Sequence, residues 1–416
     1  MERPLSIISR HYVLAAGGTG GHMTPAHALA EELMRRGHRV ALVTDDRGAR
    51  IPGLFDGVQV HILPAGRLGG GPVGWWKAFR KILTGRAMAS RLYETFAPSA
   101  VIGFGGYPAL PALLAAQRQR IPTLIHEQNA VLGRVNRLMA GRVDAIATSY
   151  DHVDRMAKAQ ERKAVLVGNP VRDAVIALRD QPFPALSGDG IFRLLVTGGS
   201  QGASIFAEVV PDGLALLPEA FRQRLQVTQQ CRAEDIVAVR AKYARFGIPA
   251  DLSTYMPDLP ERLSWAHLVI GRAGASTIAE LTVAGRPAIL IPLPSATDDH
   301  QTANALEMAK AGGARVMRQT KLSLADIADV DIVPVGEERR HTTGRFTPLE
   351  LSRQMQKLAL EPGALANAAE RARALGRPDA ASALADLVER TGRTRGEELV
   401  GAAETRHASL PSGAYA

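Results

Sequence analysis

Residues 12–22 read YVLAAGGTGGH, and residues 193–203 read RLLVTGGSQGA. Both stretches follow one plan: an apolar run, a pair of glycines, Thr or Ser, another glycine and then a helical pattern. A glycine turn between an apolar strand and a helix is typical of the first strand–helix pair of a doubly wound α/β domain. The repeated plan therefore predicts two such domains.

Short apolar runs alternate with helical patterns on either side of these stretches. In the first half of the chain the runs are 12–16, 40–44, 100–103, 123–126, 145–148 and 164–167, and in the second half they are 193–197, 225–229, 268–270 and 288–291. This alternation predicts βαβ units with parallel sheets. We expect an α/β protein with two Rossmann-like doubly wound domains that face a deep cleft.

Local composition divides the chain. We expect an N-terminal domain over 1–168, a linker over 169–189 and a C-terminal domain over 190–375, since the segment 180–189 is rich in Pro, Gly and Ser. Residues 376–390 predict a last amphipathic helix. The tail 391–416 consists mainly of polar and small residues, which predicts disorder.

The net charge and the cysteine content indicate the compartment of the protein and the kinds of ligand that it can bind. The chain has 416 residues, a formal net charge of +9 and a single cysteine, Cys231, which cannot form an internal disulfide. Neither a signal peptide nor an apolar run of roughly 18–20 residues is recognisable, so we expect a cytosolic protein. A basic surface suits nucleic acid, anionic lipid or a phosphate-bearing ligand. Without zinc-finger spacing or an RNP-like aromatic pattern, no nucleic acid is expected as a partner.

The first glycine stretch carries His22. We expect Thr24 to cap the following helix and Pro25 to be its first residue, which leaves His22 just ahead of the helix. A histidine there can take a proton from an attacking hydroxyl near neutral pH, or it can simply hydrogen-bond the loop backbone. The acidic pair 45–46 keeps a dinucleotide-binding alternative open, although the glycine spacing fits that fingerprint poorly.

A polar cluster ends the apolar run at 123–126, and it consists of His126, Glu127, Gln128 and Asn129. Four polar side chains are poor core material, and they stand where open α/β sheets bind ligands, so we expect a site there. Further on, Asn169 and Arg172 lie beside the expected linker. Arg172 either binds a phosphate or a base edge, or it is an ordinary surface arginine.

Residues 271–287 (GRAGASTIAELTVAGRP) predict another loop and helix after a strand. Glu280, about one turn into that helix, is either a ribose-binding carboxylate or a solvated glutamate. A polar cluster after the next strand suits hydrogen bonding to a sugar at least as well as metal ligation, and it contains Asp298, Asp299, His300, Gln301 and Asn304. We interpret the Asp-Val-Asp sequence at 329–331 as a chance match to a metal motif.

Residues 66–86 (GRLGGGPVGWWKAFRKILTGR) predict a helix that binds a membrane surface. Aromatic and aliphatic side chains interleave with basic ones, which suits the headgroup region of anionic lipid. The alternative is a helix packed on the sheet with a basic outer face. The side chains expected at the membrane are Trp75, Trp76, Phe79, Ile82, Lys77, Arg80 and Lys81.

Seven motifs follow one another along residues 17–305: GGTGGH, GFGGYP, HEQNAVLGRVNR, GNPVR, GGSQGA, GRAGASTIAEL and DDHQTANA. In this order they resemble the MurG family, the transferases that add N-acetylglucosamine to lipid I in bacterial peptidoglycan synthesis. One glycine loop would be unspecific, whereas seven ordered motifs are highly specific. The resemblance implies the GT-B fold, with the donor domain C-terminal, the acceptor domain N-terminal and the last helix crossing back to the first domain.

The resemblance also implies substrates and site residues. The implied donor is UDP-N-acetylglucosamine, and the implied acceptor is undecaprenyl-linked lipid I, which becomes lipid II. Glu280 would bind the ribose, Gln301 the sugar and Ser200 a phosphate. The backbone of Met256 would read the uracil edge, with Tyr255 against the ring. Because His300 stands where some relatives carry a second glutamine, contact of the sugar with His300 or with Gln301 stays open. The remaining implied contacts are Asn129, Arg172, Ala275, Ser276 and Thr277 for the donor, and Thr19, Gly20 and Gly21 on the acceptor side.

The expected reaction is a direct, inverting displacement in which His22 is the base and no metal or other cofactor is required. The protein is expected on the cytoplasmic face of the bacterial inner membrane as a peripheral protein. Proteins of cell-wall synthesis are candidate partners, and the processes implied are peptidoglycan synthesis, cell shape and cell division. Three alternatives remain: a related GT-B enzyme with another acceptor, a UDP-N-acetylglucosamine 2-epimerase, and a non-catalytic nucleotide-sugar sensor.

Overall fold

The computed structural model describes residues 9–18, 20–51, 54–64, 66, 71–199, 202–319 and 342–393. Thr19, Ser200 and the residues 329–331 lie outside the described residues. The expected tail, 391–416, also lies outside them except for 391–393, which are helical and not disordered as expected. The chain forms two compact units. The first unit holds Met1–Gln128, Leu132–Pro170 and Asp379–Ala416, and the second holds Asn129–Val131 and Val171–Pro378.

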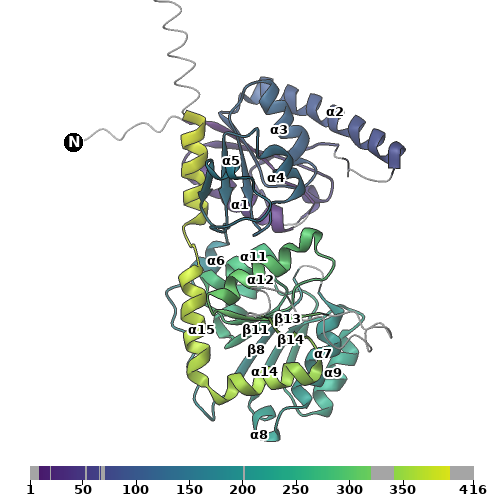
Figure 1. Ribbon diagram of the computed structural model, residues 1–416, viewed down its shortest axis with the longest axis vertical. Coiled ribbons are helices and arrows are strands. Elements are labelled where there is room, and N and C mark those ends of the chain that lie inside the picture. The colour runs from purple at the N-terminus through teal and green to yellow at the C-terminus, as the bar shows by residue number, and fades with distance from the viewer. Residues whose placement is uncertain are drawn as a thin grey trace, which may run out of the picture. The chain divides into compact units, whose positions relative to one another are not determined.

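The first unit is built on a parallel sheet of seven strands (Figure 1). The strands are β1 (His11–Ala15), β2 (Arg39–Thr44), β3 (Gln59–Ile62), β4 (Ala100–Gly103), β5 (Thr123–Glu127), β6 (Ala145–Thr148) and β7 (Ala164–Leu166). Their order in the sheet is β3-β2-β1-β4-β5-β6-β7. The direction of winding reverses between β1 and β4, and ligands of such sheets bind outside the carboxyl ends of the strands at this switch point.

Helices cover both faces of this sheet. On one face pack α1 (Gly20–Arg35) and the helix at 380–393, and on the other pack α2 (Gly71–Phe96), α3 (Ala109–Arg118) and α4 (Arg134–Met139). Successive side chains of β1 point to opposite faces of the sheet, so Tyr12 and Leu14 enter one core and Val13 enters the other. The short elements of this unit are η1 (Gly48–Arg50) and α5 (Lys158–Glu161).

The second unit repeats the plan. Its strands are β8 (Phe192–Thr197), β9 (Leu225–Gln230), β10 (Ala250–Ser253), β11 (Leu268–Gly271), β12 (Ala288–Leu290), β13 (Ala314–Arg318) and β14 (Thr342–Arg345). They form a parallel sheet in the order β10-β9-β8-β11-β12-β13-β14. The switch point lies between β8 and β11, so the second glycine stretch follows the strand at the switch point, as the first one does.

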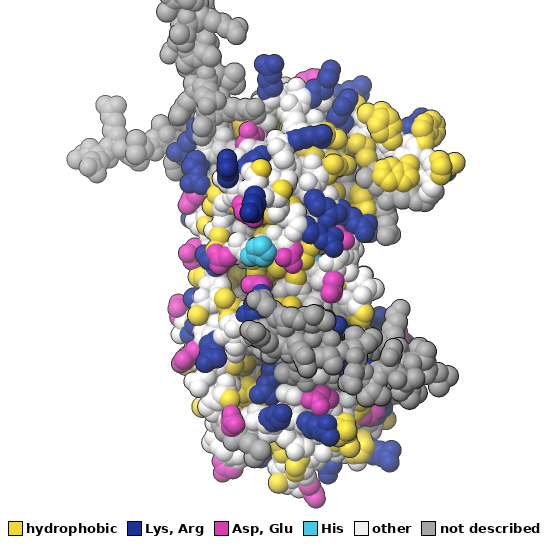
Figure 2. Space-filling view, in the orientation of Figure 1, with side chains coloured by type: hydrophobic (Ala, Val, Ile, Leu, Met, Phe, Trp, Pro, Cys, Tyr) yellow, Lys and Arg dark blue, Asp and Glu magenta, His cyan; other side chains and the backbone are white. Residues whose placement is uncertain are grey.

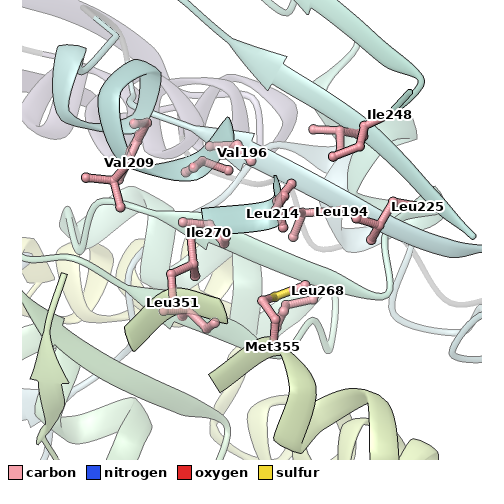
Figure 3. Packing of buried hydrophobic residues seen from close by; sticks show 14 of the residues in the cluster. Leu194, Val196, Val209, Leu214, Leu225, Ile248, Leu268, Ile270, Leu351 and Met355 are labelled. Carbon is pink, nitrogen blue, oxygen red and sulfur yellow. The ribbon is translucent and has the colours of Figure 1, made fainter. Parts of the chain in front are cut away.

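Two layers of helices also cover this second sheet. One face carries α7 (Ser204–Ala215), α8 (Glu219–Arg222), α9 (Ile236–Arg245) and α14 (Pro348–Leu360). Figure 3 shows the core on that face, where Leu194 and Val196 of β8 share one cluster with Leu351 and Met355 of α14. The opposite face carries α6 (Asp173–Ile176), α10 (Leu259–Trp265), α11 (Ala275–Val283), α12 (His300–Lys310, preceded by η2, Thr297–Asp299) and α15 (Pro362–Leu375).

The structure departs from the expected elements in three places. Helix α1 begins at Gly20, so Thr24 is not its cap, Pro25 lies inside the helix and His22 belongs to the first turn. The four strands that the apolar runs did not predict are β3, β10, β13 and β14. Of these, β3 and β10 are edge strands with no fully buried residue, so they lack the apolar run that marks an inner strand. The expected linker does not stand apart, because Val175 and Leu178 belong to the core of the second unit.

The helix at 380–393 belongs to the first unit. Leu384 and Val388 are fully buried in the core that also holds α1. Beside this apolar contact, Arg36 at the end of α1 donates to Asp386 at 2.6 Å and to Glu389 at 3.1 Å. Arg36 also donates to Glu32 at 2.7 Å, so one guanidinium joins the two helices through three carboxylates.

Among the described residues, no helix is both long enough and apolar enough to cross a lipid bilayer.

Candidate active site

The first glycine loop packs on the loop after β4. A side chain at Gly17 would meet Pro108 at 2.4 Å, and one at Gly106 would meet the carbonyl oxygen of Gly17 at 2.7 Å. Glycine is therefore required at both places for close approach of the two loops. This contact explains why GFGGYP accompanies GGTGGH, although the two motifs are far apart in sequence.

His22 is held between these loops. Its Nδ1 lies 3.1 Å from Oε1 of Gln128, which follows β5. On the other side, Gly105 has a φ of +93°, and a Cβ there would lie 3.0 Å from Cε1 of His22. The hydrogen bond to Gln128 and the backbone at Gly105 therefore both contribute to the orientation of the ring. Gly20 and Gly21, expected to line the acceptor side, form the first turn of α1 together with His22.

Asp45 fixes the start of the first loop. Its Oδ1 accepts from the backbone N–H groups of Gly18 at 3.2 Å and Gly48 at 2.9 Å. Burial alone would raise the pKa of Asp45, but these hydrogen bonds and the nearby Arg47 outweigh it and lower the pKa. Asp45 is thus an ionised group that orders the loop, which is a different role from the ribose contact of the dinucleotide-binding alternative.

The polar residues at the end of β5 and directly after it alternate in direction, as residues of a strand do. His126 and Gln128 are buried and hydrogen-bonded to each other at 3.0 Å. Glu127, which is also buried, accepts from Gly133 N–H at 2.8 Å and from the amide of Asn136 at 2.9 Å. Glu127 therefore holds the turn into α4, which accounts for the rest of the HEQNAVLGRVNR motif.

Asn129 belongs to the second unit and is held by Asn304 of α12. Asn304 is fully buried and donates to Oδ1 of Asn129 at 3.0 Å and to the carbonyl of Ala273 at 3.1 Å. Its own Oδ1 accepts from the backbone N–H of Ala130 at 2.8 Å. The sequence interpretation grouped Asn304 with a polar cluster but gave it no role, and only its burial identifies it as the clamp of Asn129.

Arg172 and Glu280, both expected at the donor, lie together in the second unit. Nη2 and Nε of Arg172 donate to Oε1 of Glu280 at 2.8 and 3.1 Å. Burial raises the pKa of Glu280, and the charge and hydrogen bond of Arg172 oppose that rise. A buried carboxylate that faces a half-exposed arginine is unlike the solvated helix glutamate of the alternative interpretation.

The first turn of α11 follows β11 at the switch point of the second sheet. Ala275 is buried, while Ser276 and Thr277 are partly exposed. The Oγ atom of Ser276 is buried and has no hydrogen-bond partner among the described residues. A buried hydroxyl without a partner is costly, so a ligand that bonds to it would complete this site.

Gln301 faces the strand ends, whereas His300 turns to its own loop. Oε1 of Gln301 accepts from the backbone N–H groups of Leu293 at 3.0 Å and Ala273 at 3.3 Å. Nδ1 of His300 lies 2.7 Å from the carbonyl oxygen of Thr297. Asp298 and Asp299, just before them, both have left-handed backbone angles, a strain that is typical of functional loops. The geometry favours Gln301 over His300 as the residue that touches a ligand. Since Oε1 of Gln301 is used by the two backbone N–H groups, its amide nitrogen is the atom that would donate to the ligand.

The expected uracil segment lies after β10. Met256 is buried in the core, and Tyr255 is 68% exposed. Because the Met256 side chain is used in packing, only its backbone is available to a base, as the resemblance implies.

The sequence did not predict a role for two further residues near the candidate site, Arg272 and Gln230. Arg272 is 9% exposed, donates to the carbonyls of Ile291 and Pro292, and lies with its guanidinium carbon 5.3 Å from the ring centroid of Phe206 in α7. No described carboxylate pairs with it, and burial lowers its pKa to about 10. Gln230 at the end of β9 accepts from Gly198 N–H of the second glycine loop at 3.1 Å. The signal for Arg272 was an arginine inside a glycine-rich motif directly after a strand.

The exposed side of α2 carries the aromatic residues expected at a membrane. Trp75, Trp76 and Phe79 are 56%, 58% and 56% exposed, and Figure 2 shows hydrophobic side chains gathered at the end of α2. Arg80 lies over the Trp76 ring at 4.9 Å. Ile82 differs from the expectation: it is partly buried and packs against the core, while Leu83 is exposed. Lys77 and Lys81 are exposed on the same helix.

Comparison with known proteins places the chain in a family. Residues 12–148 match the glycosyltransferase family 28 N-terminal domain, and residues 193–331 match the glycosyltransferase family 28 C-terminal domain. The chain is 64% identical to the UDP-N-acetylglucosamine–N-acetylmuramyl-(pentapeptide) pyrophosphoryl-undecaprenol N-acetylglucosamine transferase of Zymomonas mobilis, over 92% of this chain and 93% of that one. It is 61% identical to the protein of the same name from Novosphingobium aromaticivorans, over 93% and 94%.

A solved structure agrees with these sequence relatives. The crystal structure of Acinetobacter baumannii MurG superimposes with a TM-score of 0.68 and 28% identity, over 92% of this chain and 99% of that one. Two seven-stranded parallel sheets with one strand order agree with the GT-B architecture expected from the motifs. The chain therefore belongs to the UDP-N-acetylglucosamine–N-acetylmuramyl-(pentapeptide) pyrophosphoryl-undecaprenol N-acetylglucosamine transferases, within glycosyltransferase family 28.

Proposed function

We propose that this chain transfers N-acetylglucosamine from UDP-N-acetylglucosamine to the 4-hydroxyl of the muramyl sugar of lipid I, with inversion, to give lipid II for peptidoglycan synthesis. The observation that carries the proposal is the 64% identity, over nearly the whole length of both chains, to a relative whose name states this donor and this acceptor. An epimerase or a sensor would not need an acceptor.

The donor is assigned to the second unit. The pair Arg172–Glu280 supplies a carboxylate for the ribose hydroxyls, and Gln301 supplies an amide nitrogen for the sugar. The buried hydroxyl of Ser276 at the start of α11 supports the same placement. Further donor contacts come from Asn129, Met256, Ala275 and Thr277, with Ser200 in the glycine loop that precedes α7.

The leaving diphosphate needs positive charge and backbone dipoles. We assign this task to the second glycine loop and to Arg272, whose buried guanidinium has no carboxylate partner among the described residues. Since a buried cation without a counter-ion is costly, an anion beside it would be bound strongly. Arg172 is held by Glu280, so its contribution to the diphosphate is weaker than the sequence suggested.

The chemical step is assigned to His22. The hydroxyl oxygen of the acceptor forms the new bond to the anomeric carbon, and its proton goes to His22. The electron pair of the broken carbon–oxygen bond leaves with the UDP phosphate. We expect His22→Ala to lower kcat by about 10²–10⁴-fold with donor binding unchanged, because general base catalysis contributes this much. Near-normal turnover would reject the assignment.

The exposed face of α2 is assigned to the membrane that carries the acceptor lipid, at the cytoplasmic face of the inner membrane. The support is the group of Trp75, Trp76 and Phe79, each more than half exposed, with Lys77, Arg80 and Lys81 on the same helix. Large exposed aromatic side chains beside basic ones suit the headgroup region of anionic lipid.

One assay tests the reaction. UDP release from UDP-N-acetylglucosamine is measured with and without a lipid I analogue, in the presence of EDTA. We expect release that requires the analogue and survives EDTA. Release without the analogue would indicate an epimerase or a hydrolase, loss of release in EDTA would reject a metal-independent reaction, and no release under any condition would reject the transferase.

A further inference from the structure

Three side chains of the first unit form a hydrogen-bonded chain that ends on His22. Nδ1 of His22 lies 3.1 Å from Oε1 of Gln128, and Nε2 of Gln128 lies 3.0 Å from Nδ1 of His126. Gln128 is 1% exposed and His126 is fully buried. The middle of this chain is therefore shielded from solvent.

The surroundings of Gln128 fix the orientation of its amide. Its Nε2 lies 3.0 Å from the carbonyl oxygen of Phe104 and 2.9 Å from that of His126. A carbonyl oxygen can only accept, so the group that faces these two atoms must be the NH₂. The oxygen of the amide then necessarily faces His22. The assignment rests on two backbone acceptors and does not depend on which histidine tautomer is assumed.

His126 secures the other end of the chain. Its Nε2 lies 2.9 Å from the carbonyl oxygen of Gly168 and therefore carries the hydrogen. Its Nδ1 is left without a hydrogen and faces the NH₂ of Gln128, whose two hydrogens are shared between this nitrogen and the two carbonyl oxygens. Burial lowers the pKa of His126 to about 4, so this ring remains neutral and keeps its acceptor at the pH of catalysis.

The orientation of the Gln128 amide determines which ring nitrogen of His22 carries a hydrogen. An amide oxygen cannot donate, so the nitrogen of His22 that faces it, Nδ1, must carry a hydrogen. In the neutral ring the lone pair then lies on Nε2. Gly105 restricts the ring on its other side, since even a Cβ at this glycine would lie within 3.3 Å of Nδ1 and 3.0 Å of Cε1.

We propose that Gln128 is a positioning residue that holds His22 in the tautomer with hydrogen on Nδ1, so that Nε2 takes the proton of the acceptor hydroxyl. This inference rests on the transferase function proposed above. In the other tautomer Nε2 would carry a hydrogen and could not act as a base. Because base catalysis typically contributes about 10²–10⁴-fold, loss of the correct tautomer is expected to remove a large part of that factor.

The first test is spectroscopic and needs no activity. In the full-length protein with ¹⁵N-labelled histidine, two-bond proton–nitrogen correlations report which ring nitrogen carries the hydrogen, and His22→Ala identifies the signal. We expect protonated Nδ1 and unprotonated Nε2 for His22 in the wild-type protein. Hydrogen on Nε2 in that protein would overturn the proposal, whatever happens to any variant.

The second test uses Gln128→Met, which keeps the length of the side chain and removes the acceptor oxygen. We expect the His22 signal to shift towards the other tautomer, and kcat to fall about 10- to 100-fold with KM for UDP-N-acetylglucosamine unchanged. In Gln128→Glu the protonated acid can donate to the carbonyl oxygens of Phe104 and His126 and still present an acceptor oxygen to Nδ1, so this variant should retain the tautomer and turn over faster than Gln128→Met. The matched control is Gln119→Met, because the side chain of Gln119 donates to the carbonyl of Ser90 in the same unit, away from His22.

The outcomes separate this proposal from the proposed function. If Gln128→Met retained hydrogen on Nδ1 and normal kcat, Gln128 would have no positioning role. If the wild-type protein had the expected tautomer but transferred no sugar to a lipid I analogue, the proposed function would fail while the tautomer assignment stood.

Discussion

Two nitrogens of Arg172 donate to the same carboxylate oxygen of Glu280: Nη2 and Nε lie 2.8 and 3.1 Å from Oε1. Among the described residues, no group donates a hydrogen bond to Oε2. The Glu280 side chain is 11% exposed and the Arg172 side chain 41% exposed. The arginine thus supports the carboxylate from the solvent side and leaves one oxygen of Glu280 for a ligand.

Glu280→Gln is expected to weaken binding of UDP-N-acetylglucosamine about 10- to 100-fold, because a hydrogen bond to a charged group contributes about 1.5–3 kcal/mol. Isothermal titration calorimetry on the full chain measures the change. The melting temperature should change little, since Arg172 remains hydrated. The control is Glu261→Gln, an exposed glutamate of the same unit, which should bind the donor as the wild type does. Unchanged affinity in Glu280→Gln would remove Glu280 from the donor site.

As the pH is lowered, donor affinity is expected to begin to fall at a higher pH than it would if Glu280 had the usual pKa of a glutamate. Burial raises the pKa of Glu280 above its usual value of about 4.3, against the opposing effect of Arg172. The ionised carboxylate accepts the ribose hydroxyls, so protonation on the acid side of this raised pKa weakens binding. Calorimetry with UDP-N-acetylglucosamine at descending pH should show this loss in the wild type and a flat profile in Glu280→Gln. Parallel profiles would contradict the prediction.

Gly105→Ala is expected to lower kcat by about tenfold or more without changing donor affinity, since general base catalysis depends on the position of the base. The added Cβ would press on the His22 ring, with 3.0 Å to Cε1. Gly57→Ala is the matched control, because Gly57 also has a positive φ, +78°, but nothing lies within 4 Å of its Cβ. Equal kinetic effects in the two variants would mean that backbone strain, and not the ring contact, is responsible.

Replacing Trp75, Trp76 and Phe79 by serine is expected to weaken binding to anionic liposomes at least about 100-fold, because each buried aromatic side chain contributes about 1.5–3 kcal/mol. Vesicle sedimentation measures the partition. The matched control replaces three exposed apolar residues of the second unit by serine, namely Leu216, Val237 and Leu349. If both triple variants bound liposomes as the wild type does, α2 would not be the membrane face. Neutralising Lys77, Arg80 and Lys81 should instead weaken binding only at low salt.

Arg36→Met is expected to destabilise the first unit by about 1–3 kcal/mol, since Glu32 and Glu389, both partly buried, each lose one charged hydrogen-bond donor. Arg35→Met is the control, because Arg35 is 72% exposed and its pair with Glu32 should contribute less than about 1 kcal/mol. Limited proteolysis of the helix at 380–393 and thermal unfolding measure the difference. Equal effects would show that the network does not hold the helix.

The hydrogen bonds of Arg36 and His38 to Glu389 should make the stability of the first unit depend on pH. Burial alone would raise the pKa of Glu389, but hydrogen bonds from Arg36 and His38 outweigh it and lower the pKa. A carboxylate with a lowered pKa stabilises the fold above its unfolded pKa of about 4.3 and loses this contribution as the pH falls through the folded value. The stability difference between wild type and Arg36→Met should therefore narrow below about pH 4.

The fold class follows from local features of the sequence. The repeated apolar run, glycine turn and helix specify the same strand–helix pair twice, because both the period of the apolar residues and the need for glycine are local properties. The polar residues at the end of β5 and at the start of α12 were recognisable for the same reason, since polar side chains that follow an apolar run have no place in a core. The edge strand β3 was missed because no residue in it is fully buried.

The hydrogen-bond partners of those polar residues depend on long-range packing. His126, Glu127 and Gln128 are neighbours in sequence, yet Glu127 turns to Asn136 while the other two join His22, more than a hundred residues away. In the same way, Arg172 meets Glu280 across 108 positions, and Asn304 holds Asn129 across 175. Hydrogen bonds require atoms within about 3 Å, and the spacing of residues along a chain does not specify which distant groups the packing of sheets and helices brings to that distance.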